Sequence, residues 1–287
     1  MSPPYRVRRP VDPLTLEVPL NPDIPLDPST PGRIPVICWV GPRHLAGDDG
    51  RLYDTVADTL TAMGWTSLTM VRGLREPQEA PEDRQVVRST VLHLSPDTLR
   101  WAQWVLADEP FLLGDLPIAW HVSARADTSS PLAQWSAYFT SDIPGEAIAD
   151  FLVALDARRH PATPFGGTEL VLEAVTGHGW LLDIDQPHTG AMDATFTTHL
   201  SYGTVPPLIQ DGDPQALTRD VGDELDGWQA WAEPVLGGRC LWAASFSSGV
   251  PHDLVAAFAR SVSSTAPVLR RVLPESTRDR LLRAPAI

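Results

Sequence analysis

The feature that most constrains the fold of this chain is an internal repeat. The segment Trp135-Ser-Ala-Tyr-Phe139 recurs 107 residues later as Trp242-Ala-Ala-Ser-Phe246. Further pairs share that spacing: Pro144 and Pro251, Ile148 and Val255, Phe151 and Phe258. Matches of several residue types at one spacing indicate that the chain contains two copies of one unit.

Upstream of these matches the spacing changes. His93-Leu94-Ser95 is matched by His199-Leu200-Ser201 at a spacing of 106 residues, and Gly64-Trp65 by Gly179-Trp180 at a spacing of 115 residues. We interpret the drift as a difference in loop length between diverged copies. On this alignment His93 and His199 are equivalent residues.

Each copy shows the same order of patterns. An amphipathic helix comes first, with Leu52, Val56 and Leu60 on one side in the first copy, and a glycine at its C-terminal end. Strand-like segments follow, and a second amphipathic helix begins near Pro144 or Pro251. The sequence therefore predicts an α+β fold of two tandem repeats, each an antiparallel sheet with helices packed on one face.

The repeat also suggests domain boundaries. Residues 1–34 hold nine prolines and are expected to form an extended arm, because proline fixes φ and lacks an N–H group. Residues 35–160 form the first predicted repeat, residues 166–273 the second, and residues 274–287 an arginine-containing tail. The short link between the repeats predicts that they pack as one body, with a groove between them as the binding site.

Several core motifs resemble a known family. Leu94-Ser95-Pro96-Asp97, Trp135-x-Ala-x-Phe139, and Pro144-x-Glu146 followed by Phe151 are similar to the actinobacterial domain of unknown function 317 of SPDY-type proteins. That family often carries the domain in tandem, and the resemblance covers roughly residues 36–273. It implies an actinobacterial source and no established activity, cofactor or catalytic residue.

The resemblance is incomplete at two places. The Pro-Asp that follows the serine of the first copy is missing from Ser201-Tyr202-Gly203, its match in the second copy. The usual threonine before the helix proline is replaced by Ile143 in one copy and Val250 in the other, which removes a capping hydroxyl group.

Composition excludes some classes of protein. No run of about 18 apolar residues exists, so no membrane span is expected, and no secretion signal is recognisable. We expect a cytoplasmic protein in which Cys38 and Cys240 are buried thiols. The net charge of −14 disfavours binding to phosphate backbones.

One cluster could hold a metal. Asp183, Asp185 and His188 form a D-x-D-x-x-H pattern near a predicted strand end. The first copy has no such carboxylates, and a solvated turn explains the pattern equally well. No dinucleotide fingerprint, phosphate-binding loop or nucleophile elbow occurs. We therefore predict no metal, no cofactor and no catalytic residues.

The binding candidates are aromatic and histidine side chains. Two pairs of tryptophans three residues apart have no partner in the repeat alignment, whereas the two histidines are matched between the copies. These candidates are Trp101, Trp104, Trp228, Trp231, His93 and His199.

Three hypotheses for function follow from these patterns. The first is a non-catalytic interaction protein, a scaffold with pseudo-two-fold symmetry that binds a protein partner. The second is a DNA- or RNA-binding protein that uses the arginines near its ends, such as Arg6, Arg270 and Arg283. The third is an uncharacterised enzyme. The sequence leaves the partner and the oligomeric state open.

Overall fold

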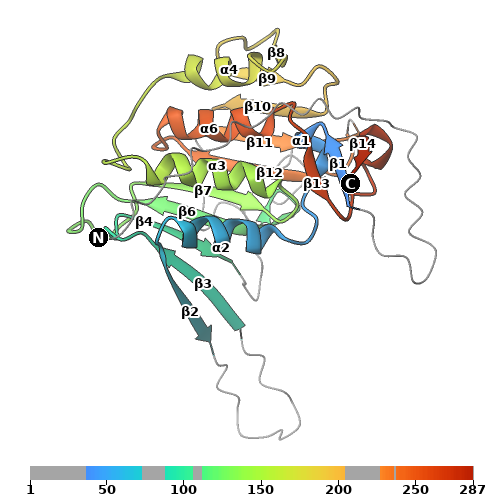
Figure 1. The fold of residues 1–287 in the computed structure, drawn as a ribbon. Coiled ribbons are helices and arrows are strands. Elements are labelled where there is room, and N and C mark those ends of the chain that lie inside the picture. The colour runs from blue at the N-terminus through green and yellow to red at the C-terminus, as the bar shows by residue number, and fades with distance from the viewer. Residues whose placement is uncertain (1–36, 73–87, 106–111, 204–226, 236, 287) are drawn as a thin grey trace, which may run out of the picture.

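A computed structural model describes residues 37–72, 88–105, 112–203, 227–235 and 237–286. The predicted arm of residues 1–34 and the acidic stretch of residues 220–226 lie outside these ranges. Within them, four helices of nine or more residues cover one face of a long antiparallel sheet (Figure 1). The predicted α+β class is confirmed. No described helix is long and apolar enough to cross a membrane.

The elements fall into two matching sets and a pair of ends. The first copy comprises α2 (Leu52–Ala62), β2 (Thr66–Arg72), β3 (Arg88–Leu94), β4 (Arg100–Trp104), β5 (Leu112–Leu113), β6 (Leu116–Ala124), β7 (Trp135–Thr140) and α3 (Gly145–Asp156). The second copy comprises α4 (Thr168–Thr176), β8 (Leu181–Leu182), β9 (Gly190–Met192), β10 (Thr198–Tyr202), β11 (Gly227–Ala232), β12 (Trp242–Ser247) and α6 (His252–Val262). The ends contribute β1 (Cys38–Gly41), α1 (Arg43–Ala46), β13 (Val268–Arg270), the 3₁₀ helix η3 (Arg278–Arg280) and β14 (Leu282–Pro285).

The two copies share a single sheet. Among the described strands its order is β2-β3-β4-β6-β7-β12-β11-β10-β9-β8, with β5 paired to β6. At the junction β7 pairs with β12 in a symmetric register: Ala137 lies opposite Phe246, and Ala244 opposite Phe139. Tyr138 lies opposite Ser245, its own equivalent in the repeat. The pseudo-two-fold axis therefore passes through that pair.

A cluster of phenylalanines fills the junction on the helix side. Phe139 and Phe151 come from the first copy, and Phe246 and Phe258 from the second. Their ring centroids are 5.1 to 5.8 Å apart in tilted and edge-on contacts. All four side chains are fully buried. Because α3 also packs along α6, the expected groove between the copies is absent from the described residues, and a continuous core stands in its place.

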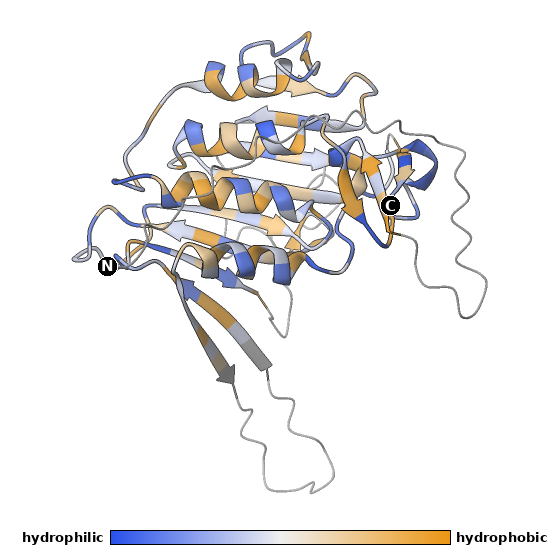
Figure 2. Cartoon of the chain, in the orientation of Figure 1, coloured by the Kyte–Doolittle hydropathy of each residue, from blue (hydrophilic) through white to orange (hydrophobic). Residues whose placement is uncertain are grey.

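The helices lie side by side across the sheet in the order α2, α3, α6, α4 (Figure 1). Figure 2 shows hydrophobic and hydrophilic residues interleaved along them, as expected for helices with one buried side. On α3 the buried stripe includes Ile148, Phe151, Leu152 and Leu155, as the sequence predicts. Trp135 and Trp242 hold equivalent buried positions in β7 and β12.

The two ends of the described chain meet in a small separate sheet of order β13-β1-β14. This sheet holds α1 against the second copy, where the main-chain oxygen of His44 accepts a hydrogen bond of 2.8 Å from Trp242 Nε1. Arg270 of β13 forms a two-pronged ion pair with Glu146 at 2.7 and 2.8 Å. Residues 282–285 of the predicted tail are thus a strand paired with β1.

Cys38 and Cys240 are both buried thiols, as expected. Burial raises the pKa of Cys240 to about 12, since a thiolate would lose its hydration, and Glu233 and Asp115 add repulsion. The thiol is therefore protonated and unreactive at neutral pH.

Candidate functional site: a corner pocket in the second copy

The paired tryptophans lie on strands, so residues three apart point to opposite faces of the sheet. Trp104 packs on Tyr53 of α2 and on Trp120, which places it on the helix side. Trp101, on the same strand, points to the other face. Trp228 likewise faces the helices, near His252 of α6. On a helix, tryptophans three residues apart would share one face. On these strands the two members of each pair lie on opposite faces and do not form a common binding surface.

Trp228 also has a repeat partner that sequence comparison missed. Trp120 pairs with Phe139 across β6 and β7, and Trp228 pairs with Phe246 across β11 and β12. The indole rings of both tryptophans are fully buried on the helix side of the sheet. Trp231 lies on the opposite face, in a smaller apolar cluster around Ile118.

The proposed equivalence of His93 and His199 is wrong. His93 lies on β3 and faces the helices, with its ring 5.7 Å from that of Trp120. His199 lies on β10 and stacks on Trp231 at 5.1 Å, on the opposite face. By sheet order β10 corresponds to β4, so the equivalent of His199 is Trp101. Burial lowers the pKa of both histidines.

The acidic pattern of the second copy forms a turn. Asp183 Oδ1 accepts hydrogen bonds from the main-chain nitrogens of Asp185 and Gln186, at 2.8 and 3.1 Å. A carboxylate that closes its own turn in this way is a common local motif. In the part of the chain that the structure describes, no three His, Cys, Asp or Glu residues gather as metal ligands would.

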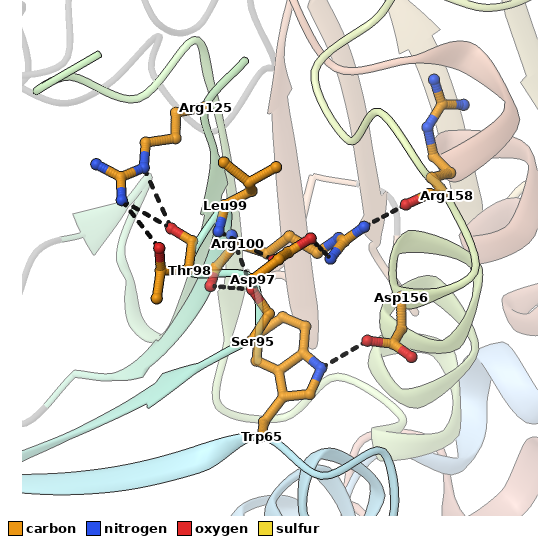
Figure 3. Close-up of polar contacts among 9 residues, drawn as sticks. All are labelled: Trp65, Ser95, Asp97, Thr98, Leu99, Arg100, Arg125, Asp156 and Arg158. Carbon is orange, nitrogen blue, oxygen red and sulfur yellow. Dashed lines mark hydrogen bonds and ion pairs between the residues drawn. The ribbon is translucent and has the colours of Figure 1, made fainter. Parts of the chain in front are cut away.

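The first copy has a filled corner where the β3–β4 turn meets the C-terminal end of α3. Figure 3 shows Arg100 reaching from β4 across this corner. Its guanidinium group donates to Asp97 Oδ2 at 2.7 Å and to the main-chain oxygen of Arg158. Nearby, Trp65 Nε1 donates to Asp156 Oδ1 at 2.8 Å (Figure 3). Arg100 is only 5 % exposed, so its charge is held inside the protein by these partners.

The second copy repeats the backbone of that turn between β9 and β10. Thr98 and Phe196 both adopt the left-handed conformation, with φ of 59° and 57°. Thr98 N donates to the oxygen of Ser95 at 2.9 Å, and Phe196 N donates to the oxygen of Asp193 at 3.0 Å. The two turns are therefore equivalent, with 98 residues between matched positions.

The side chains of the two turns exchange roles. In the first turn Ser95 Oγ donates to Asp97 Oδ1 at 2.7 Å. In the second turn the carboxylate comes first, and Asp193 Oδ2 accepts from Thr195 Oγ1. The turn motif that seemed to be lost at Ser201-Tyr202-Gly203 is thus retained, in altered form, at residues 193–196. The alignment of Ser95 with Ser201 placed this turn at the end of β10, whereas it lies between β9 and β10.

The corner of the second copy is open, with a pocket of about 440 Å³. Three segments of that copy line it: residues 178–180, 193–195 and 263–265. These correspond to the segments of the first copy that meet around Arg100. The remaining wall comes from Pro42, His44 and Leu45 near α1, and from Arg280. Thr198 replaces Arg100 at the matched position of β10. The side chain that enters this corner comes instead from α1: the ring of His44 lies edge-on to that of Trp180, with centroids 5.6 Å apart.

His44 and Asp193 are the buried polar groups of the pocket. Neither ring nitrogen of His44 has a hydrogen-bond partner in the structure, and Nε2 lies 3.8 Å from Asp193 Oδ2. Burial lowers the pKa of His44 to about 4, although Asp193 acts in the opposite direction, so the ring is neutral at pH 7. Burial alone would raise the pKa of Asp193, but hydrogen bonds from Thr195 and Thr197 hold it below its usual value.

A serine and a histidine also meet in the pocket. His178 Nδ1 lies 2.9 Å from Ser263 Oγ. The hydroxyl group of Ser263 donates to the main-chain oxygen of Ala259 at 2.7 Å. Because a hydroxyl group has one proton, Ser263 acts as the acceptor toward His178. This arrangement is the reverse of an activated nucleophile, whose proton must point to its base.

A second polar cluster lies on the sheet face opposite the helices. His121 Nε2 lies 2.8 Å from Ser123 Oγ and 3.2 Å from Ser136 Oγ. Both serines are buried within the sheet. The cluster therefore satisfies polar groups in the interior and offers no hydroxyl group to an external substrate.

Comparison with known families agrees with the repeat. Residues 94–162 and 211–268 match the SPDY family, described as a domain of unknown function (DUF317). No curated protein and no solved structure shows significant similarity to the chain. The two matched segments contain the junction strands and the closing helices of the two copies. Two segments of this chain therefore match the SPDY-type domain of the DUF317 family, one in each copy of the repeat.

Proposed function

We propose that this protein is a non-catalytic binding protein whose ligand occupies the corner pocket of the second copy. The single observation that carries the proposal is the difference between two equivalent corners. One is closed by the protein's own Arg100, whereas the other is open and lined by the same turn geometry and by buried polar groups. Concave sites with a few buried polar groups are the usual places for ligands, so we attribute the open second corner to a ligand.

The polar groups of the pocket support binding over catalysis. Asp193 accepts hydrogen bonds at both oxygens from residues 195–198, which leaves it poorly placed to take a proton. The proton of Ser263 is held by the main chain. The ring of His44 has no hydrogen-bond partner among the described residues, but its pKa of about 4 makes it a weak base at neutral pH.

The arginines that the structure describes give little support to the hypothesis of DNA or RNA binding. Arg270 is buried and bound to Glu146, and Arg158 is paired with Asp253 on α6. Charges that are neutralised inside the protein contribute little to phosphate binding.

The hypothesis of a protein partner changes in one respect: the binding site moves from the centre of the molecule to the edge of the second copy.

A screen by ligand-observed NMR on the full chain tests the proposal. Ala194 is exposed on the pocket wall, so Ala194→Trp would fill the pocket without disturbing the core. Pro96→Trp places the same side chain on the matched, closed corner and serves as the control. We expect a library of small polar compounds to give ligands that Ala194→Trp loses and Pro96→Trp retains. Ligands that are insensitive to Ala194→Trp, or a screen without ligands, would refute the proposal.

A further inference from the structure

The internal symmetry identifies the kind of ligand. We infer that the pocket of the second copy binds a guanidinium group, supplied by another molecule, in the place where the first copy holds the guanidinium group of Arg100. This inference rests on the proposed function and specifies its ligand.

The first copy shows how this corner accommodates such a group. Arg100 bridges two walls: the carboxylate of Asp97 on the turn, and the main-chain oxygen of Arg158 after α3 (Figure 3). A planar guanidinium group suits this geometry because its donors point in fixed directions toward two acceptors. The corner is thus built from a turn and a helix end that together complement one cation.

The second copy keeps the backbone of both walls but lacks Arg100 and the carboxylate that binds it, because Thr195 stands at the position of Asp97 and the carboxylate of Asp193 at that of Ser95. The turn at residues 193–195 and the segment after α6, residues 263–265, both line the pocket. Thr198, at the position of Arg100, is fully buried, and its Oγ1 has no hydrogen-bond partner in the structure. The replacement of arginine by threonine removes a long charged side chain from the corner.

The charges around the pocket favour a cation. Asp193 is a buried carboxylate, and its depressed pKa keeps it ionised at neutral pH. Segments that follow the C-terminal ends of α4 and α6 line the pocket, and helix C-termini carry partial negative charge. The imidazole of His44 is neutral and adds no repulsion. Arg280 is the opposing charge, and it lies exposed at the pocket wall, where water screens it.

The protein as a whole also attracts cations, since its net charge is −14. A guanidinium group can come from a small molecule, such as free arginine, or from an arginine side chain of a partner protein. Both sources share the chemistry of the pocket. An arginine side chain of a protein brings peptide groups with it, so the pocket mouth must have room for them, whereas a small molecule does not need that room.

Calorimetric titration of the full chain tests the inference. The probes are free arginine, agmatine, and an arginine residue within a blocked tripeptide, each paired with its citrulline or neutral urea counterpart. The pairs have the same shape and differ in charge. We expect each arginine compound that binds to bind at least about tenfold more tightly than its neutral counterpart. Binding of agmatine or arginine alone indicates a small-molecule ligand, and binding of the peptide indicates a protein partner.

A gain-of-affinity variant provides a second readout. The double substitution Asp193→Ser with Thr195→Asp copies the turn chemistry of the first copy, where serine precedes the carboxylate. It moves the negative charge from a buried position to the pocket wall, as at Asp97. We expect arginine compounds to bind this variant about tenfold more tightly than the unaltered protein, and neutral counterparts to bind it unchanged.

The outcomes separate the two proposals. Equal affinity for charged and neutral counterparts, or tighter binding of anions, overturns the guanidinium inference. If pocket ligands sensitive to Ala194→Trp still exist in that case, the proposed binding function stands. If no ligand of any charge is sensitive to Ala194→Trp, the proposed function itself fails.

Discussion

Removal of one phenylalanine at the junction should destabilise both copies together. Phe246 lies on β12, and its ring contacts Phe139 and Phe151 of the first copy and Phe258 of its own. Truncation of a fully buried phenylalanine to alanine costs about 3–5 kcal/mol, from lost burial and from the cavity that remains. For a chain of this size each kcal/mol corresponds to about 2–4 °C, so the Tm of Phe246→Ala should fall by on the order of 10 °C.

The decisive result is the number of transitions. Because the rings belong to both copies, we expect one calorimetric transition in Phe246→Ala, shifted as a whole. Hydrogen exchange should speed up equally in β4 and in β10, which lie on either side of the junction. Val153→Ala, at a half-exposed position of α3, is the control and should change stability by less than about 0.5 kcal/mol. Two separate transitions, with β4 unaffected, would refute the single-body argument.

Two further predictions concern buried charge. The pKa of His44 is about 4 in the folded protein against 6.5 when exposed, so the unfolded chain binds a proton first as pH falls. The free energy of unfolding should therefore drop by about 3 kcal/mol between pH 6.5 and 4. Urea denaturation of His44→Leu should show a shallower decline with pH. The same dependence on pH in the variant and the unaltered protein would count against a neutral buried ring. Arg270 and Arg43 outweigh burial and lower the pKa of Glu146, so that pair stabilises the fold above the usual carboxyl pKa and its contribution is lost in acid. Arg270→Ala should cost about 3–5 kcal/mol at pH 7, and thermal unfolding of Arg270→Ala and Glu146→Gln, alone and combined, should reveal coupling; additive effects would contradict a direct pair.

The sequence identified the parts of the fold in which large side chains recur at a fixed spacing. Trp135 and Phe151 match Trp242 and Phe258 because each must fill the same buried position beside the junction. The class, the tandem arrangement and the closing helices follow from those positions. Periodicity along one chain contains no information on how β7 meets β12, so the continuous sheet could not be predicted.

The candidate site was harder to predict for a different reason. The strands upstream of the junction are joined by turns and loops of unequal length, and alignment by identical letters paired His93 with His199 across different strands. The true match between Ser95 and Asp193 preserves a hydrogen-bonding role with a different side chain, which letter identity does not detect. The pocket also depends on His44, which lies 149 positions before Asp193 in the sequence and reaches it only because the chain ends form a common sheet.

The symmetric register of β7 and β12 has a consequence for the history of the fold. Ala137 lies opposite Phe246, and its equivalent Ala244 lies opposite Phe139. Such a reciprocal contact is isologous, the kind that joins two identical subunits. A polypeptide with one copy would leave β7 as an open edge and would bury its junction phenylalanines by forming a homodimer. The tandem chain thus has the geometry of two subunits of a homodimer joined in one polypeptide. Two halves in one chain can diverge independently, so a corner that Arg100 fills in the first copy can stand open in the second.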